Sequence, residues 1–281
     1  MELAQLLSKF SNLKKIKKGG QKIVYWALNQ DSQQVALKII HDAADPRVLQ
    51  EIAIVQDIQL DHVPRIFESG TVTDNSVGEE ALYIVEEYID GISMRDWLNQ
   101  GHTANLSLAF NILHTLISIE IELEKKKILH RDINPNNIIL GSDGKIYLID
   151  FGLAKKIGGT SLTQTAATMG PFTPGYAPHE QFANMKMAQD VRTDLFQIGV
   201  TIYECCTGQN PFVQPQDSIY DIMTRTMTLM PPAAVLPGDK TGMFSQFINM
   251  LMAKNQSQRP DTALDAMRYL MAIKSTLELE E

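Results

Sequence analysis

Short apolar runs separated by polar turns fill the first ninety residues of the chain. The runs are rich in β-branched and aromatic residues, as strands are, and a turn-rich interval over residues 70–78 separates the last two. Before the third run, Pro46 opens a segment whose apolar positions recur at a spacing near 3.6 up to Ile58, which predicts one helix. The predicted strands are 23–27, 34–39, 63–67 and 82–88, and we expect an antiparallel sheet.

After Gly91 the pattern changes to helical periodicity. The longest apolar segment, 106–123, is interrupted by four polar residues, so it predicts a buried amphipathic helix and not a membrane span. A chain of 281 residues is close to the size at which one core divides into two. The predicted helices are 94–100, 106–126, 194–207, 218–229, 241–253 and 262–279, with 277–281 as a frayed helix end.

These patterns predict an α+β, bilobal fold with lobes 1–90 and 91–281. The small N-terminal lobe would hold the antiparallel sheet and one helix, and the larger C-terminal lobe would be mainly helical.

Composition and charge narrow the class of protein. The chain is 44% hydrophobic and 21% charged with a net charge of −8, which excludes a disordered chain and argues against a general binder of nucleic acid or membrane surfaces. The only cysteines, Cys205 and Cys206, are adjacent, and a disulfide between them would be strained. Residues 1–10 lack the continuous apolar stretch of a signal peptide. We therefore expect a cytoplasmic protein.

One segment carries the most specific chemistry of the chain. Residues 130–137 read HRDINPNN, an apolar run starts at Ile138, and DFG follows twelve residues later at 150–152. A lone aspartate in a turn indicates nothing, but two motifs at this separation are informative. Together they resemble the catalytic loop and the metal-binding motif of the eukaryotic-type (Hanks-type) serine/threonine protein kinase family.

The resemblance implies transfer of the γ-phosphoryl group of ATP to a serine or threonine hydroxyl of a protein substrate, with autophosphorylation. It also implies that lobe 1–90 binds the nucleotide and that lobe 91–281 carries catalysis and substrate binding. Asp132 would be the base that orients and deprotonates the hydroxyl, and Asn137 and Asp150 would hold Mg²⁺, which prefers oxygen ligands. Asn134 stands where these kinases usually carry lysine. We therefore expect weaker stabilisation of the transition state, and a faster chemical step in Asn134→Lys.

Upstream, VALK at 35–38 resembles the third-strand motif of the same family. The resemblance implies that Lys38 contacts the ATP phosphates and pairs with a glutamate on the following helix. Glu51 fits that place, and Asp57 is the weaker alternative. This pair would position the phosphates for transfer.

The phosphate-covering loop is degenerate by comparison with the family. Only Gly19 remains of three expected glycines, because Lys17 and Lys22 occupy the other two places, so the loop should be stiffer. Lysines between 14 and 22 either attract triphosphate or form a solvated basic face. The resemblance also implies that adenine meets the backbone of Glu87 and Ile89 and the side chains of Val24, Ala36 and Ile139.

Glu86 falls at the position that guards the back of the adenine pocket in this alignment. A buried carboxylate is unfavourable unless it is hydrogen-bonded, paired or protonated. Two interpretations stay open: a buried, partnered Glu86, or an alignment that is shifted by one residue.

TPGYAPHE at 173–180 resembles the segment that ends the activation loop of the family. The resemblance implies that Glu180 pairs with the buried Arg259 and that Asp194 starts the central helix and anchors the backbone of the catalytic loop. Arg131 before Asp132 implies regulation by a phosphate. The candidate acceptors are Thr160, Ser161, Thr163, Thr165 and Thr168.

Two other functions compete with an active protein kinase. An ATP-binding pseudokinase that acts as a scaffold would explain the degenerate glycine loop, Glu86 and Asn134, but the residues at 38, 51, 132, 137 and 150 are intact. A small-molecule phosphotransferase would lack the arginine of the catalytic loop and the 173–180 segment. The protein substrate, the oligomeric state and the source organism stay open.

Overall fold

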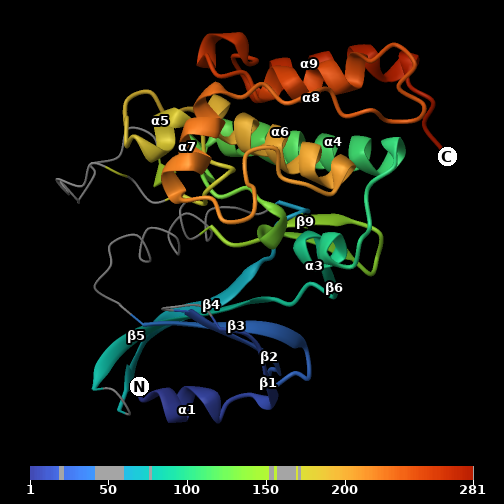
Figure 1. Cartoon of the computed structure of the whole chain (residues 1–281). Helices are drawn as coiled ribbons and strands as arrows, with labels where there is room; N and C mark the ends of the chain where they lie inside the picture. Colours follow the sequence, from blue (N-terminus) through green and yellow to red (C-terminus); the bar gives the residue numbers. More distant parts are fainter. Residues whose placement is uncertain are drawn as a thin grey trace. The chain divides into compact units, whose positions relative to one another are not determined.

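The computed structural model describes residues 1–18, 22–41, 60–75, 78–151, 155–156, 169 and 172–280. The chain divides into two compact units, Met1–Asp90 and Gly91–Glu281 (Figure 1). The first unit is built on a sheet and the second mainly on helices. This agrees with the predicted α+β class.

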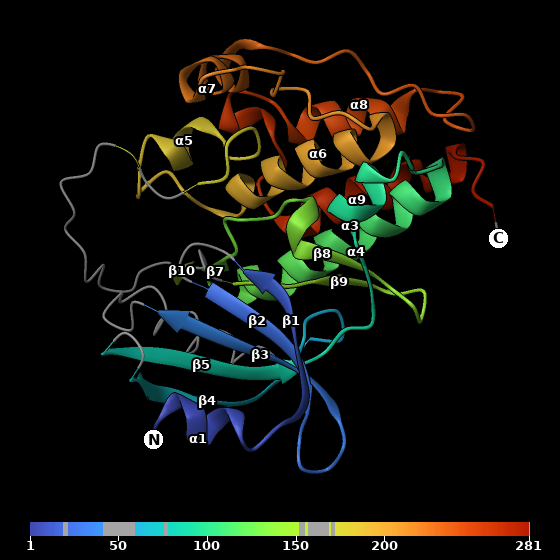
Figure 2. The ribbon, with the colours of Figure 1, turned by 60° about the horizontal axis from the view of Figure 1, so that its bottom comes forward.

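The first unit is a five-stranded antiparallel sheet in the order β1-β2-β3-β5-β4, with a short helix, α1, beside it (Figure 2). Leu6 of α1 is completely buried against one face of the sheet, together with alternate residues of the central strands. The elements are α1 Leu3–Leu7, β1 Ser11–Lys18, β2 Lys22–Leu28, β3 Gln34–His41, β4 Ile66–Asp74 and β5 Glu79–Glu87.

The register of the sheet sorts the side chains onto two faces, because successive residues of a strand point to opposite sides. Leu37, Tyr83 and Val85 belong to the α1 face. The opposite face carries the residues that alternate with them, among which Val24 is paired with Lys38, and Ala36 with Glu86. On this second face, Ile40, Leu82 and Ile84 form a small apolar cluster.

Several predictions for this unit are wrong. The strand expected at 63–67 begins only at Ile66 and continues to Asp74, through most of the interval predicted as a turn. Gly70 belongs to the strand because it faces Tyr83, whose ring would lie 2.9 Å from a Cβ atom there. Neither α1 nor β1 was predicted. The helix predicted at 46–58 and Gly19 lie outside the described residues.

The second unit packs four helices, α4, α6, α8 and α9, against one another (Figure 1). Short strands and turns connect the remaining helices, and α6 is buried along almost its whole length. Its elements are β6 Gly91–Ser93, α3 Met94–Asn99, α4 Leu106–Lys125, β7 Ile128–Leu129, η1 Pro135–Asn137, β8 Ile138–Gly141, β9 Ile146–Leu148, β10 Lys155–Lys156, α5 His179–Phe182, α6 Val191–Thr207, α7 Ile219–Thr228, α8 Met243–Leu251, η2 Gln256–Gln258, α9 Ala263–Ile273 and η3 Lys274–Thr276.

The predicted helices are present, with changed ends. α6 begins at Val191, three residues before the predicted start at Asp194. Asp190 caps the helix, because its side chain accepts a hydrogen bond from the N–H of Arg192. α9 ends at Ile273. Residues 277–280 are therefore not a frayed helix end, and the N–H of Glu280 donates to Ser107 Oγ at 2.6 Å.

α4 is the helix predicted to be buried, and ten of its residues are buried against its neighbours. By length and composition it is also the one helix in the described part of the chain that meets the requirements of a bilayer span. Its partners α6 and α9 cover it. The expectation that the protein has no membrane span stays a prediction.

Candidate active site

The first turns of α6 hold the backbone of the loop 130–137. Asp194, completely buried, accepts hydrogen bonds from the N–H of His130 at 2.8 Å and of Arg131 at 2.7 Å. One turn later, Gln197 Oε1 accepts from the N–H of Ile133 at 2.8 Å. The predicted anchoring role of Asp194 is confirmed.

Two glutamines, one from α5 and one from α6, hold the carbonyl group of Arg131 in the same loop. The carbonyl of Arg131 accepts hydrogen bonds from Gln181 Nε2 at 2.8 Å and from Gln197 Nε2 at 2.9 Å. Arg131 needs this support because its φ of 64° is unfavourable for a residue with a side chain. The sequence analysis missed both glutamines, since a glutamine in a helix carries no signal of such a role.

The carboxylate of Asp132 is the centre of the site. Its Oδ1 accepts hydrogen bonds from Asn134 Nδ2 at 2.9 Å and from Thr173 Oγ1 at 2.5 Å, and its Oδ2 accepts from Asn137 Nδ2 at 2.8 Å. Three side chains, one of them 41 residues away in the chain, thus fix its orientation. Thr173 is a member of the site that the sequence analysis did not single out.

Burial raises the pKa of Asp132 to about 6, and the negative charge of Asp150 adds to the rise. The hydrogen bonds from Thr173, Asn137 and Asn134 act in the opposite direction and favour the ionised form. A carboxylate with this pKa is ionised at neutral pH and is a stronger base than an ordinary aspartate. Asp132 can therefore take a proton from a hydroxyl group.

Asn134 has a structural task that its sequence position does not reveal. Its side chain donates to the carboxylate and to the carbonyl of Asp132, and its Oδ1 accepts from the N–H of Asn136 at 3.0 Å, which caps η1. The residue is only 2% exposed. The expectation that lysine would improve the site is therefore reversed, because lysine cannot replace the capping acceptor.

Asn137 and Asp150 are the residues predicted to hold a cation, and this role stays a prediction. The backbone joins them, since the N–H of Ile149 donates to the carbonyl of Asn137 at 2.8 Å, and Asp150 has a positive φ of 70°. The described residues contain no cluster of three or more carboxylate, histidine or cysteine side chains that would enclose a metal. An amide and a carboxylate suit Mg²⁺, which keeps water and phosphate oxygens in its shell.

In the first unit, Lys38 and Glu86 form an ion pair, with Nζ and Oε1 2.7 Å apart and the side chains 6% and 10% exposed. Of the two interpretations of Glu86, the buried and partnered one holds. Glu86 lies opposite Ala36 in the sheet, so its side chain is on the same face as Lys38. Glu51, the predicted partner of Lys38, lies outside the described residues.

The residues predicted to surround adenine lie in both units, and their roles stay predictions. Val24 and Ala36 are buried on the Lys38 face of the sheet, and Ile139 is half-buried in β8. The N–H of Glu87 donates to the carbonyl of Arg65 at 2.8 Å, so it is not available to adenine. Ile89 follows β5 and is half-buried.

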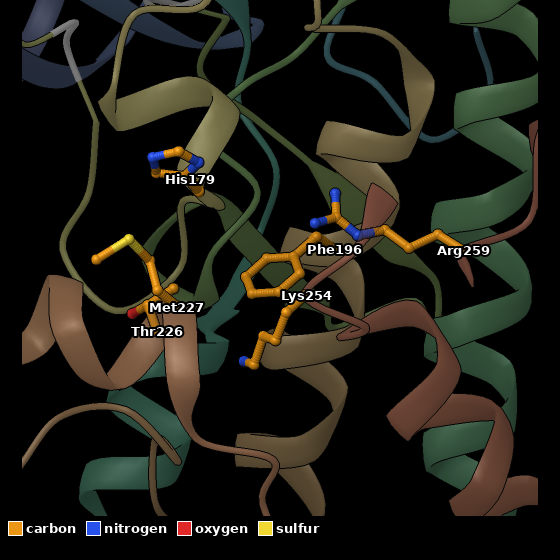
Figure 3. Close-up of a pocket in the computed structure, with 6 residues that line it drawn as sticks. All are labelled: His179, Phe196, Thr226, Met227, Lys254 and Arg259. Carbon is orange, nitrogen blue, oxygen red and sulfur yellow. The ribbon is translucent and has the colours of Figure 1, made fainter. Parts of the chain in front are cut away.

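The predicted pair of Glu180 and Arg259 is confirmed, with Nη1 and Oε1 2.6 Å apart. The Arg259 guanidinium and the Lys254 ammonium both lie over the ring of Phe196, and these residues line a hollow of about 140 Å³ beside α7 (Figure 3). Burial, and then repulsion by Arg259, lowers the pKa of Lys254 to about 7. The ion pair of Glu180 and Arg259 fastens α5 to the segment that follows α8. The candidate phosphate acceptors between 160 and 168 lie outside the described residues.

Known proteins resemble the chain over nearly its whole length. A probable serine/threonine-protein kinase, PknB of Lactococcus lactis, is 29% identical over 208 residues, which cover 71% of this chain and 32% of that protein. Serine/threonine-protein kinase PknL of Mycobacterium tuberculosis is 27% identical over 287 positions, which cover 100% of this chain and 69% of that protein. The chain thus spans about a third of the first relative and about two thirds of the second.

The family assignment joins these likenesses to the geometry. Residues 10–270 match the protein kinase domain family. The two units have the sheet and the helices expected for that family, and Asp132, Asn137 and Asp150 lie in one loop system of the second unit. The chain therefore belongs to the protein kinase domain family.

Proposed function

We propose that this domain transfers the γ-phosphoryl group of ATP to serine or threonine hydroxyls of a protein substrate, with Mg²⁺ as cofactor. The observation that carries the proposal is the carboxylate of Asp132, held by three hydrogen bonds and with its pKa raised to about 6. It stands where the resemblance requires a base.

The residues of the chain divide the work of phosphoryl transfer. Asp132 orients the attacking hydroxyl and takes its proton, and Thr173 and Asn134 hold the carboxylate in place. Lys38 supplies positive charge for the phosphates. Mg²⁺ bound by Asn137 and Asp150 would neutralise charge on the phosphates. None of these tasks needs a covalent intermediate with the protein.

The proposal extends to autophosphorylation and to a cytoplasmic location, where ATP is available. The two thiols, which are unpaired in the structure, fit a reducing compartment. The proposal names serine and threonine hydroxyls as the acceptors and assigns no particular protein substrate.

The test is a transfer assay with labelled ATP, Mg²⁺ and a generic protein substrate, followed by mapping of the phosphorylated residues. Asp132→Asn should lower turnover by about 10² to 10⁴ and leave ATP affinity nearly unchanged, because the base is lost and not a nucleotide contact. Asp143→Asn, an exposed carboxylate in the turn between β8 and β9, is the matched control. Equal activity of wild type and Asp132→Asn would refute the mechanism, and phosphotyrosine as the product would refute the serine/threonine assignment.

A further inference from the structure

The ion pair of Lys38 and Glu86 joins two neighbouring strands of the first unit. The two residues are diagonal neighbours on β3 and β5, since Lys38 lies opposite Ile84 and Glu86 opposite Ala36. Both side chains therefore leave the same face of the sheet, and their charged atoms are 2.7 Å apart. The carboxylate is built into the strand next to the lysine and needs no movement of a helix to reach it.

The surroundings of the pair make it strong. Val24 and Ala36, both less than 10% exposed, are its neighbours on that face, and the apolar cluster of Ile40, Leu82 and Ile84 continues it. Water therefore screens the attraction only weakly. Val24 and Ala36 are also the residues predicted to surround adenine, so the ion pair lies on the face of the sheet that is expected to meet the nucleotide.

We infer that Glu86 competes with the phosphates of ATP for the Lys38 ammonium and thereby lowers the affinity of this protein for ATP; the inference rests on the proposed function. An ammonium group has three N–H donors. Glu86 takes one of them, and Lys38 has at least one further interaction in the structure. A phosphate oxygen that takes the donor held by Glu86 has to displace that carboxylate.

The charge balance points in the same direction. In the nucleotide-free unit the pair is neutral, so Lys38 offers a triphosphate much less attraction than an isolated ammonium does. A phosphate that reaches Lys38 also comes close to the Glu86 carboxylate, and like charges in a poorly screened place repel. The pair therefore stabilises the free unit and opposes the bound state, and a ligand binds more weakly when it has to disturb a contact of the free protein.

The experiment measures ATP and adenosine binding to the full chain by isothermal titration calorimetry with Mg²⁺. Glu86→Gln keeps the shape and an acceptor for Lys38 but removes the charge, so ATP should bind about tenfold more tightly, which corresponds to about 1.4 kcal/mol. Adenosine has no phosphate, and its affinity should stay unchanged. Glu80→Gln is the matched control, because Glu80 is an exposed carboxylate of the same strand, opposite Thr73, and is not among the residues predicted to bind nucleotide.

A second background tests whether the effect passes through Lys38. In Lys38→Met, the further change Glu86→Gln should alter ATP affinity less than about threefold, since the shared partner is gone. Glu86→Met is the second charge-free variant, should Glu86→Gln not fold, and it should show the same tighter binding.

The possible outcomes separate the inference from the proposed function. Equal or weaker ATP binding by both charge-free variants, with unchanged adenosine binding, overturns the inference, and so does a gain that persists in Lys38→Met. Wild-type protein that binds neither ATP nor adenosine overturns the proposed kinase function itself. Tighter ATP binding in Glu86→Gln, combined with unchanged ATP binding in Glu80→Gln, supports competition for Lys38.

Discussion

Replacement of Arg259 by methionine should strongly destabilise the second unit. Arg259 is 3% exposed, and its Nη1 donates to Glu180 Oε1 at 2.6 Å and to the carbonyl of Arg192 at 3.0 Å. Its Nε donates to the carbonyl of Ala253 at 2.8 Å. Methionine fills part of the volume but leaves the Glu180 charge and two carbonyls without these partners.

The expected magnitude follows from the burial of both partners. Removal of one member of a buried ion pair costs about 3 to 5 kcal/mol, a large part of the roughly 5 to 15 kcal/mol that holds a domain folded. The double variant Glu180→Met/Arg259→Met should lose less, because no lone charge remains. Arg268→Met should lose at most about 0.5 kcal/mol, since that side chain is 70% exposed and its pair with Asp265 is a surface pair.

The two tryptophans allow the measurement to be confined to one unit. Trp26 lies in the first unit and Trp97 in the second. In a Trp26→Phe background, urea unfolding followed by fluorescence reports on the second unit alone. A loss below about 1 kcal/mol in Arg259→Met, or a double variant as unstable as the single one, would show that this pair does not carry the expected energy.

Three further predictions concern the site and the core. Turnover should rise with pH through about 6 as Asp132 loses its proton. Thr173→Val should move this midpoint to higher pH, because the hydrogen bond from Thr173 lowers the pKa of Asp132. An unmoved midpoint in the pH–rate profile would contradict this reasoning. Asn134→Lys should slow the transfer step in single-turnover kinetics, because it removes the cap of η1 and a hydrogen-bond partner of Asp132. A faster transfer step would show instead that the charge of lysine improves the site. Burial raises the pKa of Glu120, whose two oxygens lack a hydrogen-bond partner within the described residues, well above its ordinary value. The folded state then keeps a proton that the unfolded chain releases, so stability falls as pH rises. Glu120→Met should therefore raise the free energy of unfolding by about 1 to 3 kcal/mol at pH 8 and by less at pH 5, and urea melts that show no gain at pH 8 would refute this.

Local patterns in the sequence are sufficient to predict the class of most elements and the catalytic motifs. Periodicity is a local property, so the helices of the second unit and the strands β2, β3 and β5 are predictable from it. The loop 130–137 and the aspartate at 150 are recognisable because their residue types and spacing are fixed by phosphoryl transfer. The resemblance to the kinase family also predicted that Asp194 anchors the catalytic loop and that Glu180 pairs with Arg259, and both contacts are present.

Contacts between side chains that are distant in the chain depend on how the chain folds. Thr173 reaches Asp132 across 41 residues, and Gln181 and Gln197 hold Arg131 across 50 and 66. A polar residue in a helix or turn has many potential partners, and only folding selects one of them. The extent of β4 was likewise decided by pairing, because its small and β-branched residues match the partner strand although they look like a turn when taken alone.

The same distinction explains the two residues whose roles changed most. Asn134 looked like a loss of charge, yet its buried amide joins Asp132 to the cap of η1. Glu86 looked like a misaligned residue, yet the register of β3 and β5 places its carboxylate beside Lys38. The sequence specifies which charges a chain carries, but their interaction energy depends on separation and on burial, and both are set only when the strands pair and the core excludes water.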